Sequence, residues 1–387
     1  MPTSSIQTNS KLPSTSTTIF SVMSQLAIEH KAINLGQGFP GFPIDNDLVS
    51  RVNEAMISGK NQYAPMPGIL PLRELLSEKM KTSYGTYYHP DNEITISAGG
   101  TQAIYTAISA LVHAGDEVIL FAPAYDCYAP AVEINGGKVV WIETSYPDYT
   151  VDWYQVEKVI NRNTKMIVVN TPQNPSSAVW SESDMMMLLS LVRNTNIIVL
   201  SDEVYEHIVF DGARHCSVAS IPELAARSLI VYSFGKTLHV TGWKLGYVVG
   251  PKELMIEFRK VHQYNVFSCS TPMQYGITEF MKNPDVYNSL SSFYEKKRDR
   301  FLSKITNEQF DIKPAKGSYF QLMQFKDMKG RSDVDLAKEW TVNGGITSIP
   351  LSVFYPEGKN EGVFRFCFAK PDDVLDSAAE KINLLGK

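Results

Sequence analysis

Two lysines lie close together in the segment from Ser233 to Gly246, which follows a short apolar run. Gly235 lets the backbone turn just before Lys236, and Lys244 follows a few residues later. A lysine held among apolar groups loses hydration of its charge, so its pKa falls and more of it is a free amine. Such an amine can form a Schiff base with a carbonyl compound. Because most lysines are surface charges, this segment alone favours two ordinary solvated lysines.

An anion site is predicted close to these lysines. Gly100 and Thr101 open an expected helix just after a strand, and N–H groups at a helix N-terminus attract anions. A plain helix cap by Thr101 is the alternative. Ser233 and Lys244 would add a hydroxyl and a cation, as a phosphate requires.

Other expected strand ends supply a ring, an acid and hydrogen-bonding groups. Tyr125 follows a proline-fixed loop, where packing is the alternative. Asn174 lies in a proline-rich run that could be only a rigid turn. Asp202 directly continues a buried strand, which is costly unless its charge is matched by a salt bridge or by a cationic ring nitrogen. Tyr205 adds a nearby hydroxyl.

Ligands of an open parallel sheet bind at the carboxyl ends of its strands, so these groups are expected to meet. One small molecule uses an anion site, a stacking ring, a buried acid, two hydrogen-bonding groups and an amine. It is pyridoxal phosphate, a phosphorylated pyridine aldehyde with a phenolic oxygen. Each segment has an independent structural explanation, but their joint occurrence in this order favours the cofactor.

The elements that position these groups follow from the apolar pattern. β-Branched runs alternate with helical patterns between residues 94 and 249, which predicts a largely parallel sheet covered on both faces. The expected strands are 94–97, 117–121, 138–142, 165–170, 197–201, 229–233 and 245–249. The expected helices between them are 101–113, 128–134, 153–161 and 182–193.

Further helices are expected at 19–29, 48–58 and 70–80, and in a long stretch over about 254–300 that is broken near 266–272. Strands at 317–322 and 362–368 with helices at 334–341 and 373–385 predict a second, smaller α+β domain.

The fold class is therefore α/β, with a large domain over 46–285 and a small domain over 286–387. A segment over 17–45 is expected to pack with the small domain. Residues 1–16 are expected to form a flexible lead-in.

Composition limits the class of protein. The 387 residues are 44% hydrophobic and 20% charged, as in soluble globular proteins. The net charge of −5 argues against a nucleic-acid partner, and no apolar run is long enough to span a membrane. The start of the chain lacks the apolar core of a secretory signal. Four scattered cysteines offer no metal spacing and suggest free thiols in a reducing cytoplasm.

A formal G-x-G-x-x-G occurs at Gly36, Gly38 and Gly41. Pro40 and Pro43 interrupt it and no helical pattern follows, so the dinucleotide interpretation is weak. We interpret the segment as an extended loop that exposes backbone N–H groups, and a dehydrogenase is a distant alternative.

Several motifs together resemble the fold-type-I pyridoxal-phosphate aminotransferases of class I/II. They are Ser233-x-x-Lys236 with Gly242-x-Lys244-x-Gly246, Asp202-x-x-Tyr205, the Asn-x-Pro-x-Asn-Pro run at 170–175, and Arg365. The resemblance extends from about Ile19 to the C-terminus. Stretches at 34–40, 61–65, 262–267 and 366–370 are most similar to bacterial methionine aminotransferases and their kynurenine aminotransferase relatives.

The resemblance implies a role for each matching residue. Lys236 carries the cofactor, and Asp202 keeps the pyridine nitrogen protonated. Asn174 and Tyr205 bind the phenolic oxygen, and Tyr125 stacks on the ring. The residues implied to hold the phosphate are Gly100, Thr101, Ser233 and Lys244.

Arg365 is implied to bind the substrate α-carboxylate together with Asn174 and the backbone at Gly38. Tyr63 matches a tyrosine that reaches the neighbour's phosphate, which implies a homodimer. Ser176 and Ser177 depart from the Thr-Gly of many relatives. Lys244 replaces an arginine found in many of them, which keeps the charge but loses the bidentate geometry.

The implied reaction is a ping-pong transfer of the amino group of methionine, and of aromatic amino acids, to a 2-oxo acid. Lys236 acts as base and then as acid. No second arginine is placed to suit a dicarboxylate. An apolar pocket suits a thioether or a ring, and its expected walls are Phe20, Phe39, Phe267, Phe354 and Tyr355, with Phe20 and Phe267 taken as substrate-binding.

Three alternatives remain open at this point. A pyridoxal-phosphate β-lyase acting on cysteine conjugates would use the same cofactor residues. A kynurenine or glutamine transaminase would differ only in its substrates. A cofactor-binding regulator is disfavoured because no basic DNA-binding segment begins the chain.

Overall fold

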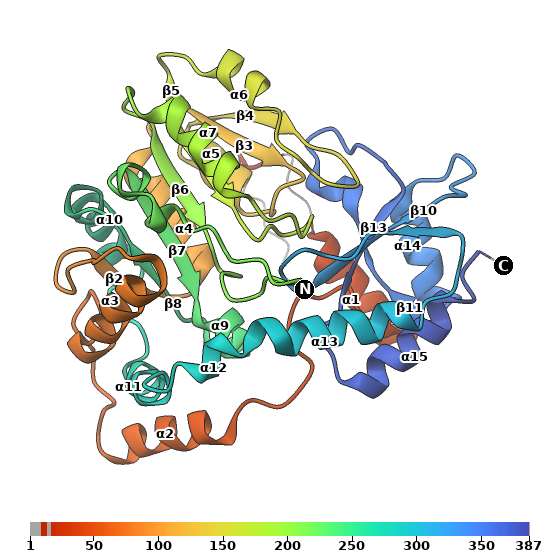
Figure 1. Cartoon of the computed structure of the whole chain (residues 1–387), viewed down its shortest axis with the longest axis horizontal. Helices are drawn as coiled ribbons and strands as arrows, with labels where there is room; N and C mark the ends of the chain where they lie inside the picture. The colour runs from red at the N-terminus through yellow and green to blue at the C-terminus, as the bar shows by residue number, and fades with distance from the viewer. Residues whose placement is uncertain (1–8, 14–16, 387) are drawn as a thin grey trace.

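Seven strands form one mixed sheet in the order β2-β8-β7-β6-β5-β3-β4 (Figure 1). This is a computed structural model, and it describes residues 9–13 and 17–386, so the lead-in expected over 1–16 lies mostly outside the described residues. The strands are β2 (Ile94–Ser97), β3 (Glu117–Ala122), β4 (Lys138–Glu143), β5 (Thr164–Asn170), β6 (Ile198–Asp202), β7 (Ser228–Ser233) and β8 (Gly246–Val249). β8 runs antiparallel to both β2 and β7, and the other strand pairs of this sheet are parallel, so the predicted α/β class with a mostly parallel sheet is confirmed.

Alternate side chains of each strand enter two different apolar layers. Val168 and Leu200 pack on one face, while Ile167 and Val199 pack on the other. The helices of the first face are α4 (Gly100–Leu111), α5 (Tyr128–Ile134) and α10 (Lys252–Asn265). The helices of the second face are α3 (Leu70–Tyr84), α6 (Trp153–Val159) and α7 (Glu182–Val192). A sheet that is buried on both faces explains the nearly continuous apolar runs of its strands.

A four-stranded antiparallel sheet, in the order β12-β13-β10-β9, forms the core of the C-terminal part. Its strands are β9 (Phe310–Ile312), β10 (Phe320–Phe325), β12 (Ile349–Pro350) and β13 (Val363–Cys367), and the helices α14 (Asp333–Val342) and α15 (Asp372–Ile382) accompany them. The expected strand at 317–322 begins only at Phe320, because Ser318 has a φ of 57°.

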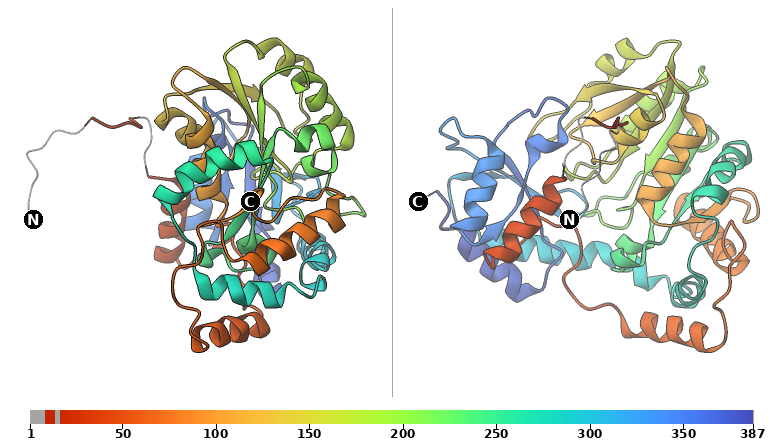
Figure 2. Two further views of the ribbon diagram at one scale, coloured as in Figure 1. Left: turned by 90° about the vertical axis from the view of Figure 1, so that its left-hand side faces the viewer. Right: turned by 180° about the vertical axis from the view of Figure 1, so that it is seen from behind.

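The N-terminal segment joins this C-terminal part. Strand β1 (Ile33–Asn34) pairs in parallel with β11 (Ile346–Thr347), and α1 (Ile19–Glu29) packs against α14. Figure 2 shows α1, in red, beside the blue C-terminal elements. The division predicted at residues 45 and 286 stays a prediction.

Helices connect the two sheets along one side of the molecule (Figure 1). They are α11 (Thr271–Phe280), α12 (Asp285–Asn288) and α13 (Leu290–Ser303), and α2 (Asn46–Ile57) packs on α11. Shorter elements are η1 (Val218–Ser220), α8 (Pro222–Ala225), α9 (Phe234–Thr237), η2 (Thr241–Trp243) and η3 (Leu351–Phe354). No helix within 17–386 combines the length and apolarity needed to cross a membrane.

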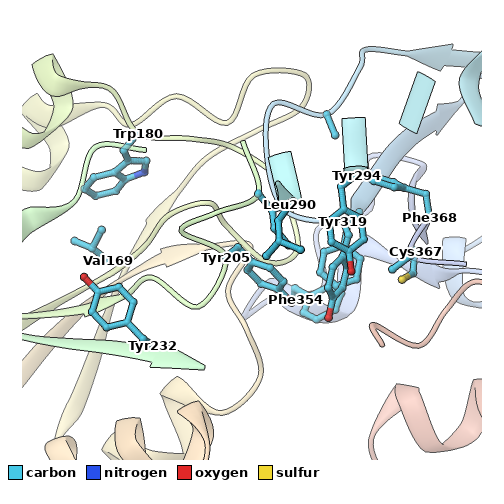
Figure 3. Close-up of a cluster of buried hydrophobic side chains, with 14 of the residues drawn as sticks. Val169, Trp180, Tyr205, Tyr232, Leu290, Tyr294, Tyr319, Phe354, Cys367 and Phe368 are labelled. Carbon is cyan, nitrogen blue, oxygen red and sulfur yellow. The ribbon is translucent and has the colours of Figure 1, made fainter. Parts of the chain in front are cut away.

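Buried aromatic side chains fill the region where the two sheets meet (Figure 3). The ring of Tyr319 lies edge-on to Tyr205 at 5.1 Å between centroids and 5.7 Å from the ring of Tyr294. The start of β10 is thereby packed against the loop that follows β6.

Candidate active site

A cavity of about 510 Å³ opens at the carboxyl ends of β5, β6 and β7. Most of the residues predicted from the sequence to form the site line this one cavity. They are Phe20, Gly38, Gly100, Thr101, Tyr125, Asn174, Asp202, Tyr205, Ser233, Lys236, Lys244 and Arg365. Phe39, an expected pocket wall, lines it as well.

Lys236 lies in α9, a single helical turn where the sequence suggested a loop. Its Nζ donates to the hydroxyl of Tyr319 at 2.8 Å and to the carbonyl of Gly38 at 3.3 Å. Burial among protein groups lowers the pKa of Lys236 to about 8, although Cys367 and Asp202 oppose this shift. The uncharged amine is therefore far more populated near neutral pH than in an ordinary lysine.

Gly235 has a different role from the one its sequence position suggested. Its φ is not positive, so the backbone turn does not require a glycine. A Cβ atom there would instead approach the Cα of Thr241 to 3.0 Å. The glycine is needed because two backbone segments pass close to each other beside Lys236.

Asp202 ends β6 and is only 4% exposed. Its Oδ2 accepts a 2.6 Å hydrogen bond from Tyr128, and its Oδ1 accepts one from the backbone N–H of Val204 at 3.3 Å. Burial raises the pKa of Asp202 to about 6, while the Tyr128 hydrogen bond acts in the opposite direction.

The salt-bridge interpretation of Asp202 is not supported within the described residues. Lys79 forms a buried ion pair with Glu206, and His215 contacts Glu203 at 2.8 Å, but neither contact includes Asp202. A carboxylate that is buried without a cation is costly. The arrangement therefore suits a positively charged ligand atom in the cavity.

The predicted anion site is formed by the start of α4. Gly99 has a φ of 84° and is the N-cap, and within residues 9–13 and 17–386 no side chain caps the first N–H groups of this helix. The plain cap by Thr101 is therefore not formed. Lys244, with a φ of 53°, places its Cε 3.7 Å from where a Cβ on Gly99 would lie. Open N–H groups and a nearby cation can bind a phosphate.

Arg365 projects from β13 and is 1% exposed. Its guanidinium hydrogen-bonds the side-chain oxygen of Asn174 and the carbonyl of Gly36, the latter at 3.0 Å. The guanidinium carbon lies 4.0 Å from the ring centroid of Phe320 and 5.2 Å from that of Phe20. Its buried Nε has no hydrogen-bond partner among the residues that the structure describes. A fixed guanidinium between apolar rings is suited to bind a carboxylate.

Several lining or supporting residues of the site were given no functional role from the sequence, and four of them bear on its chemistry. Phe320 and Asn170 line the cavity, Tyr128 binds Asp202, and Tyr319 binds Lys236. The aromatic pair at the start of the expected strand 317–322 was the available signal for Tyr319 and Phe320. No local pattern links Tyr128 to a residue that lies 74 positions away.

The Ser176-Ser177 departure has a structural explanation. Ser177 has a φ of 62°, a conformation that glycine adopts readily. Its hydroxyl donates to the carbonyl of Phe320 at 2.7 Å and lies 3.0 Å from the hydroxyl of Ser318. The serine thus fixes the segment that carries Tyr319 and Phe320.

Tyr63 and Phe267 do not line the cavity of their own chain. Their side chains pack edge-on at 5.4 Å between centroids, and Tyr63 is 83% exposed. Phe354 and Tyr355 also lie outside the lining. Phe354 packs behind Arg365, and the Tyr355 hydroxyl donates to the carbonyl of Thr144 at 2.9 Å.

Known proteins share both this sequence and this fold. The sequence profile of the family "Aminotransferase class I and II" matches residues 30–382. Methionine aminotransferase of Escherichia coli is 42% identical over 97% of this chain and 98% of its own length. Human kynurenine–oxoglutarate transaminase 1 is 33% identical over 92% of this chain and 93% of its own.

Two solved structures show the same agreement in three dimensions. The structure of YbdL from Escherichia coli, described as having a methionine aminotransferase function, has a TM-score of 0.95 at 42% identity and covers 98% of this chain and 100% of its own. The N-succinyldiaminopimelate aminotransferase of Mycobacterium tuberculosis has a TM-score of 0.94 at 31% identity, with the same coverage. With a cavity that gathers an amine, a buried acid, an anion site and a fixed guanidinium, this chain belongs to the class I and II aminotransferase family and is a transaminase.

Proposed function

We propose that this aminotransferase uses pyridoxal phosphate to move the amino group of methionine, and of aromatic amino acids, to a 2-oxo acid. The observation that carries the proposal is the gathering of Lys236, Asp202 and Arg365 in one cavity with the open N-terminus of α4. The donor set fits this cofactor because its phosphate, its ring nitrogen and its aldehyde each have a suitable partner.

Each part of the cofactor would have its own set of residues. Gly100, Thr101, Ser233 and Lys244 would hold the phosphate, and Tyr125 would stack on the ring. Asp202 would pair with the ring nitrogen, and Asn174 and Tyr205 would bind the phenolic oxygen. When bound, the cofactor supplies the aldehyde that captures the substrate amine and a ring that takes up electrons.

The protein groups would carry out binding and proton transfer. Arg365 holds the α-carboxylate, so the Cα–H bond is fixed relative to Lys236. Lys236 removes the α-proton as an uncharged amine, and it later returns the proton as an ammonium. Its pKa of about 8 suits both tasks near neutral pH. Asp202 remains ionised against the positive ring nitrogen.

The lining of the cavity favours an apolar side chain on the substrate. Phe20, Phe39 and Phe320 contribute rings, and Arg365 is the one arginine among the described lining residues. A dicarboxylic amino acid would bury a second carboxylate without a dedicated partner, which is unfavourable. The 42% identity to an enzyme named for methionine supports the same choice.

A homodimer in the cytoplasm is part of the proposal. Tyr63, absent from its own cavity, would reach the phosphate site of a second copy, with the half-exposed Phe267 beside it. Mixing two variants that should each be inactive, Lys236→Ala and Tyr63→Ala, tests this arrangement. Hybrid dimers contain one site with both side chains, so activity should return on mixing. No recovery after verified subunit exchange would contradict the shared site.

The visible spectrum tests the cofactor and the reaction together. The purified protein should show an absorption band of the lysine-bound cofactor, and methionine without an acceptor should convert it to the aminated form. Lys236→Ala should retain no turnover. A protein reconstituted with cofactor that shows no band, or a fully active Lys236→Ala, would refute the proposal.

A substrate panel separates the alternatives. Methionine, phenylalanine and kynurenine are each assayed with several 2-oxo acids. A cysteine conjugate is assayed without an acceptor, where pyruvate and ammonia would reveal β-lyase activity. Transfer that requires an acceptor and is fastest with methionine supports the proposal.

A further inference from the structure

Tyr319 occupies a defined place between the N-terminal segment and Lys236. Its side chain is fully buried, and its hydroxyl donates to the carbonyl of Gly38 at 2.7 Å. The same hydroxyl accepts from the Nζ of Lys236 at 2.8 Å. The carbonyl of Gly38 also accepts from that Nζ at 3.3 Å. One amine thus has two acceptors that are themselves hydrogen-bonded to each other.

This geometry matches the needs of an uncharged amine that must act as a base. A neutral amine has two N–H groups and one lone pair. When Tyr319 and Gly38 accept the two N–H groups, the lone pair is left to point toward the cavity. After protonation, the third N–H occupies that direction and can be delivered to an atom in the cavity.

The surroundings of Tyr319 keep its hydroxyl protonated and hold it in place. Burial raises the pKa of Tyr319 well above its usual range, so the hydroxyl keeps its proton. Ser177 holds the backbone of Phe320, the next residue, by the hydrogen bond described above. The rings of Tyr205 and Tyr294 pack against Tyr319 (Figure 3). The hydroxyl therefore has little freedom to leave the amine.

We propose that Tyr319 is a positioning residue that, with the carbonyl of Gly38, receives the free amine of Lys236 and aims its lone pair into the cavity for proton transfer. The inference rests on the proposed function and deepens it. It makes the start of β10 part of the catalytic arrangement, although Tyr319 itself does not line the cavity.

Several other groups influence the pKa of the Lys236 amine. A test of Tyr319 must therefore leave these groups unchanged. Cys367 and Asp202 favour its charged form, whereas Arg365 and Lys244 disfavour it. Tyr205 presents its ring 5.5 Å from Nζ. Tyr319→Phe leaves all of these groups and the ring of residue 319 in place, so it removes only one hydroxyl.

Tyr294→Phe is a matched control. Tyr294 is fully buried, its ring packs on that of Tyr319, and its hydroxyl has no protein partner in the described structure. Both variants delete one buried tyrosine hydroxyl within the same aromatic cluster. Only Tyr319→Phe deletes a hydrogen bond to Lys236.

The first experiment titrates Lys236 in the cofactor-free full-length protein. The rate of acetylation of Lys236 by acetic anhydride is followed against pH by peptide mass spectrometry. Loss of a hydrogen bond that favours the ammonium should lower the pKa of Lys236 by about one in Tyr319→Phe, since such bonds are worth roughly tenfold or more in an equilibrium. Tyr294→Phe should match the wild type.

The second experiment follows the single-turnover reaction of the cofactor-loaded protein with methionine. Tyr319→Phe should lower its maximal rate about tenfold or more, with the pH midpoint moved down and the substrate dissociation constant nearly unchanged. Tyr294→Phe should leave the maximal rate, the pH midpoint and the substrate dissociation constant unchanged. Equal titration curves and equal rates for the two variants would overturn the inference while leaving an active wild type, and hence the proposed function, intact. A wild type that fails to transaminate would refute the proposed function, while the titration still tests the contact with Lys236.

Discussion

The hydroxyl of Tyr128 donates a 2.6 Å hydrogen bond to Oδ2 of Asp202. This contact joins the first turn of α5 to the end of β6, and it gives a buried acid one neutral partner instead of a cation. A hydroxyl orients a carboxylate but does not neutralise it. The protein therefore holds Asp202 in a position that is costly until a cation arrives.

Asp202→Asn should stabilise the cofactor-free protein at pH 8. The pKa of Asp202 is raised to about 6 by burial, against about 3.9 in an unfolded chain. Binding of a proton to Asp202 in the folded state therefore stabilises the protein fully below about pH 4, and this stabilisation is lost as the pH rises through 6. Asparagine does not titrate, so the variant should gain up to about 3 kcal/mol above pH 6.

Urea unfolding of both cofactor-free proteins from pH 4 to pH 8 measures this gain. The difference between them should shrink toward pH 4. A difference in the free energy of unfolding between the two proteins that does not change with pH would contradict this prediction. The same variant should lose most of its transaminase activity. The Asp202 carboxylate would then be shown to destabilise the cofactor-free fold and yet to be needed for the reaction.

Arg365→Lys should raise KM for methionine. An ammonium cannot reproduce the paired N–H groups that now bind Asn174 and Gly36, nor the planar guanidinium whose central carbon lies 4.0 Å from the ring centroid of Phe320. Loss of a charge-assisted bond to the substrate carboxylate should lower kcat/KM by about 100-fold, or about 3 kcal/mol. The amine analogue of methionine that lacks the carboxylate is the matched control. Equal losses for the two substrates would contradict a carboxylate role for Arg365.

The strand ends that form most of the site could be predicted because the chain repeats one pattern. Apolar β-branched runs alternate with amphipathic helices, and parallel strands deliver their carboxyl ends to one edge. Asp202 directly follows such a run, and Asn174 and Lys236 come a few residues after the ends of theirs. Their meeting in one cavity also depends on the order of the strands in the sheet, which the alternation does not give and the structure shows.

Contacts between distant segments could not be predicted in the same way. Tyr128 with Asp202 and Tyr319 with Lys236 depend on side-chain directions that no local period encodes. Strands β1 and β11 have two residues each, which is too short for an alternating pattern. The need for glycine at Gly235 comes from Thr241, which only the folded chain brings close. Local sequence patterns thus predicted which residues lie at the carboxyl edge of the sheet, whereas the contacts between distant segments arise from tertiary packing.

Phe20→Ala should change substrate preference. Phe20 lines the cavity from α1 and packs on Arg365. A side chain as long as that of methionine or phenylalanine would contact this ring, whereas the methyl group of alanine would not. Losing this apolar wall should lower kcat/KM about tenfold for the two larger substrates, with alanine as the internal control. A uniform loss across all three would indicate a structural role for Phe20.

Lys79→Met should destabilise the protein strongly. Lys79 and Glu206 form an ion pair at 2.7 Å, and both side chains are only 2% exposed. Burial alone would raise the pKa of Glu206, but Lys79, with His207, lowers it well below its usual range. Removing the cation leaves a buried carboxylate without its main partner, which costs about 3–5 kcal/mol. Glu206 lies next to Tyr205 in sequence, so the loss should also disturb the site.

The pH dependence distinguishes this mechanism from simple loss of packing. In the wild type, the lowered pKa of Glu206 adds stability above about pH 4.3, and this is lost as pH falls. In Lys79→Met, burial should raise that pKa, so stability should instead increase as pH falls from 7 toward 5.

The double variant Lys79→Met/Glu206→Gln carries no charge there and should recover part of the loss. Lys260→Met, which breaks the exposed pair with Glu257, should cost less than about 1 kcal/mol. Urea unfolding at each pH measures all four proteins, and a loss in Lys79→Met that does not depend on pH would show that packing, not charge, is the cause.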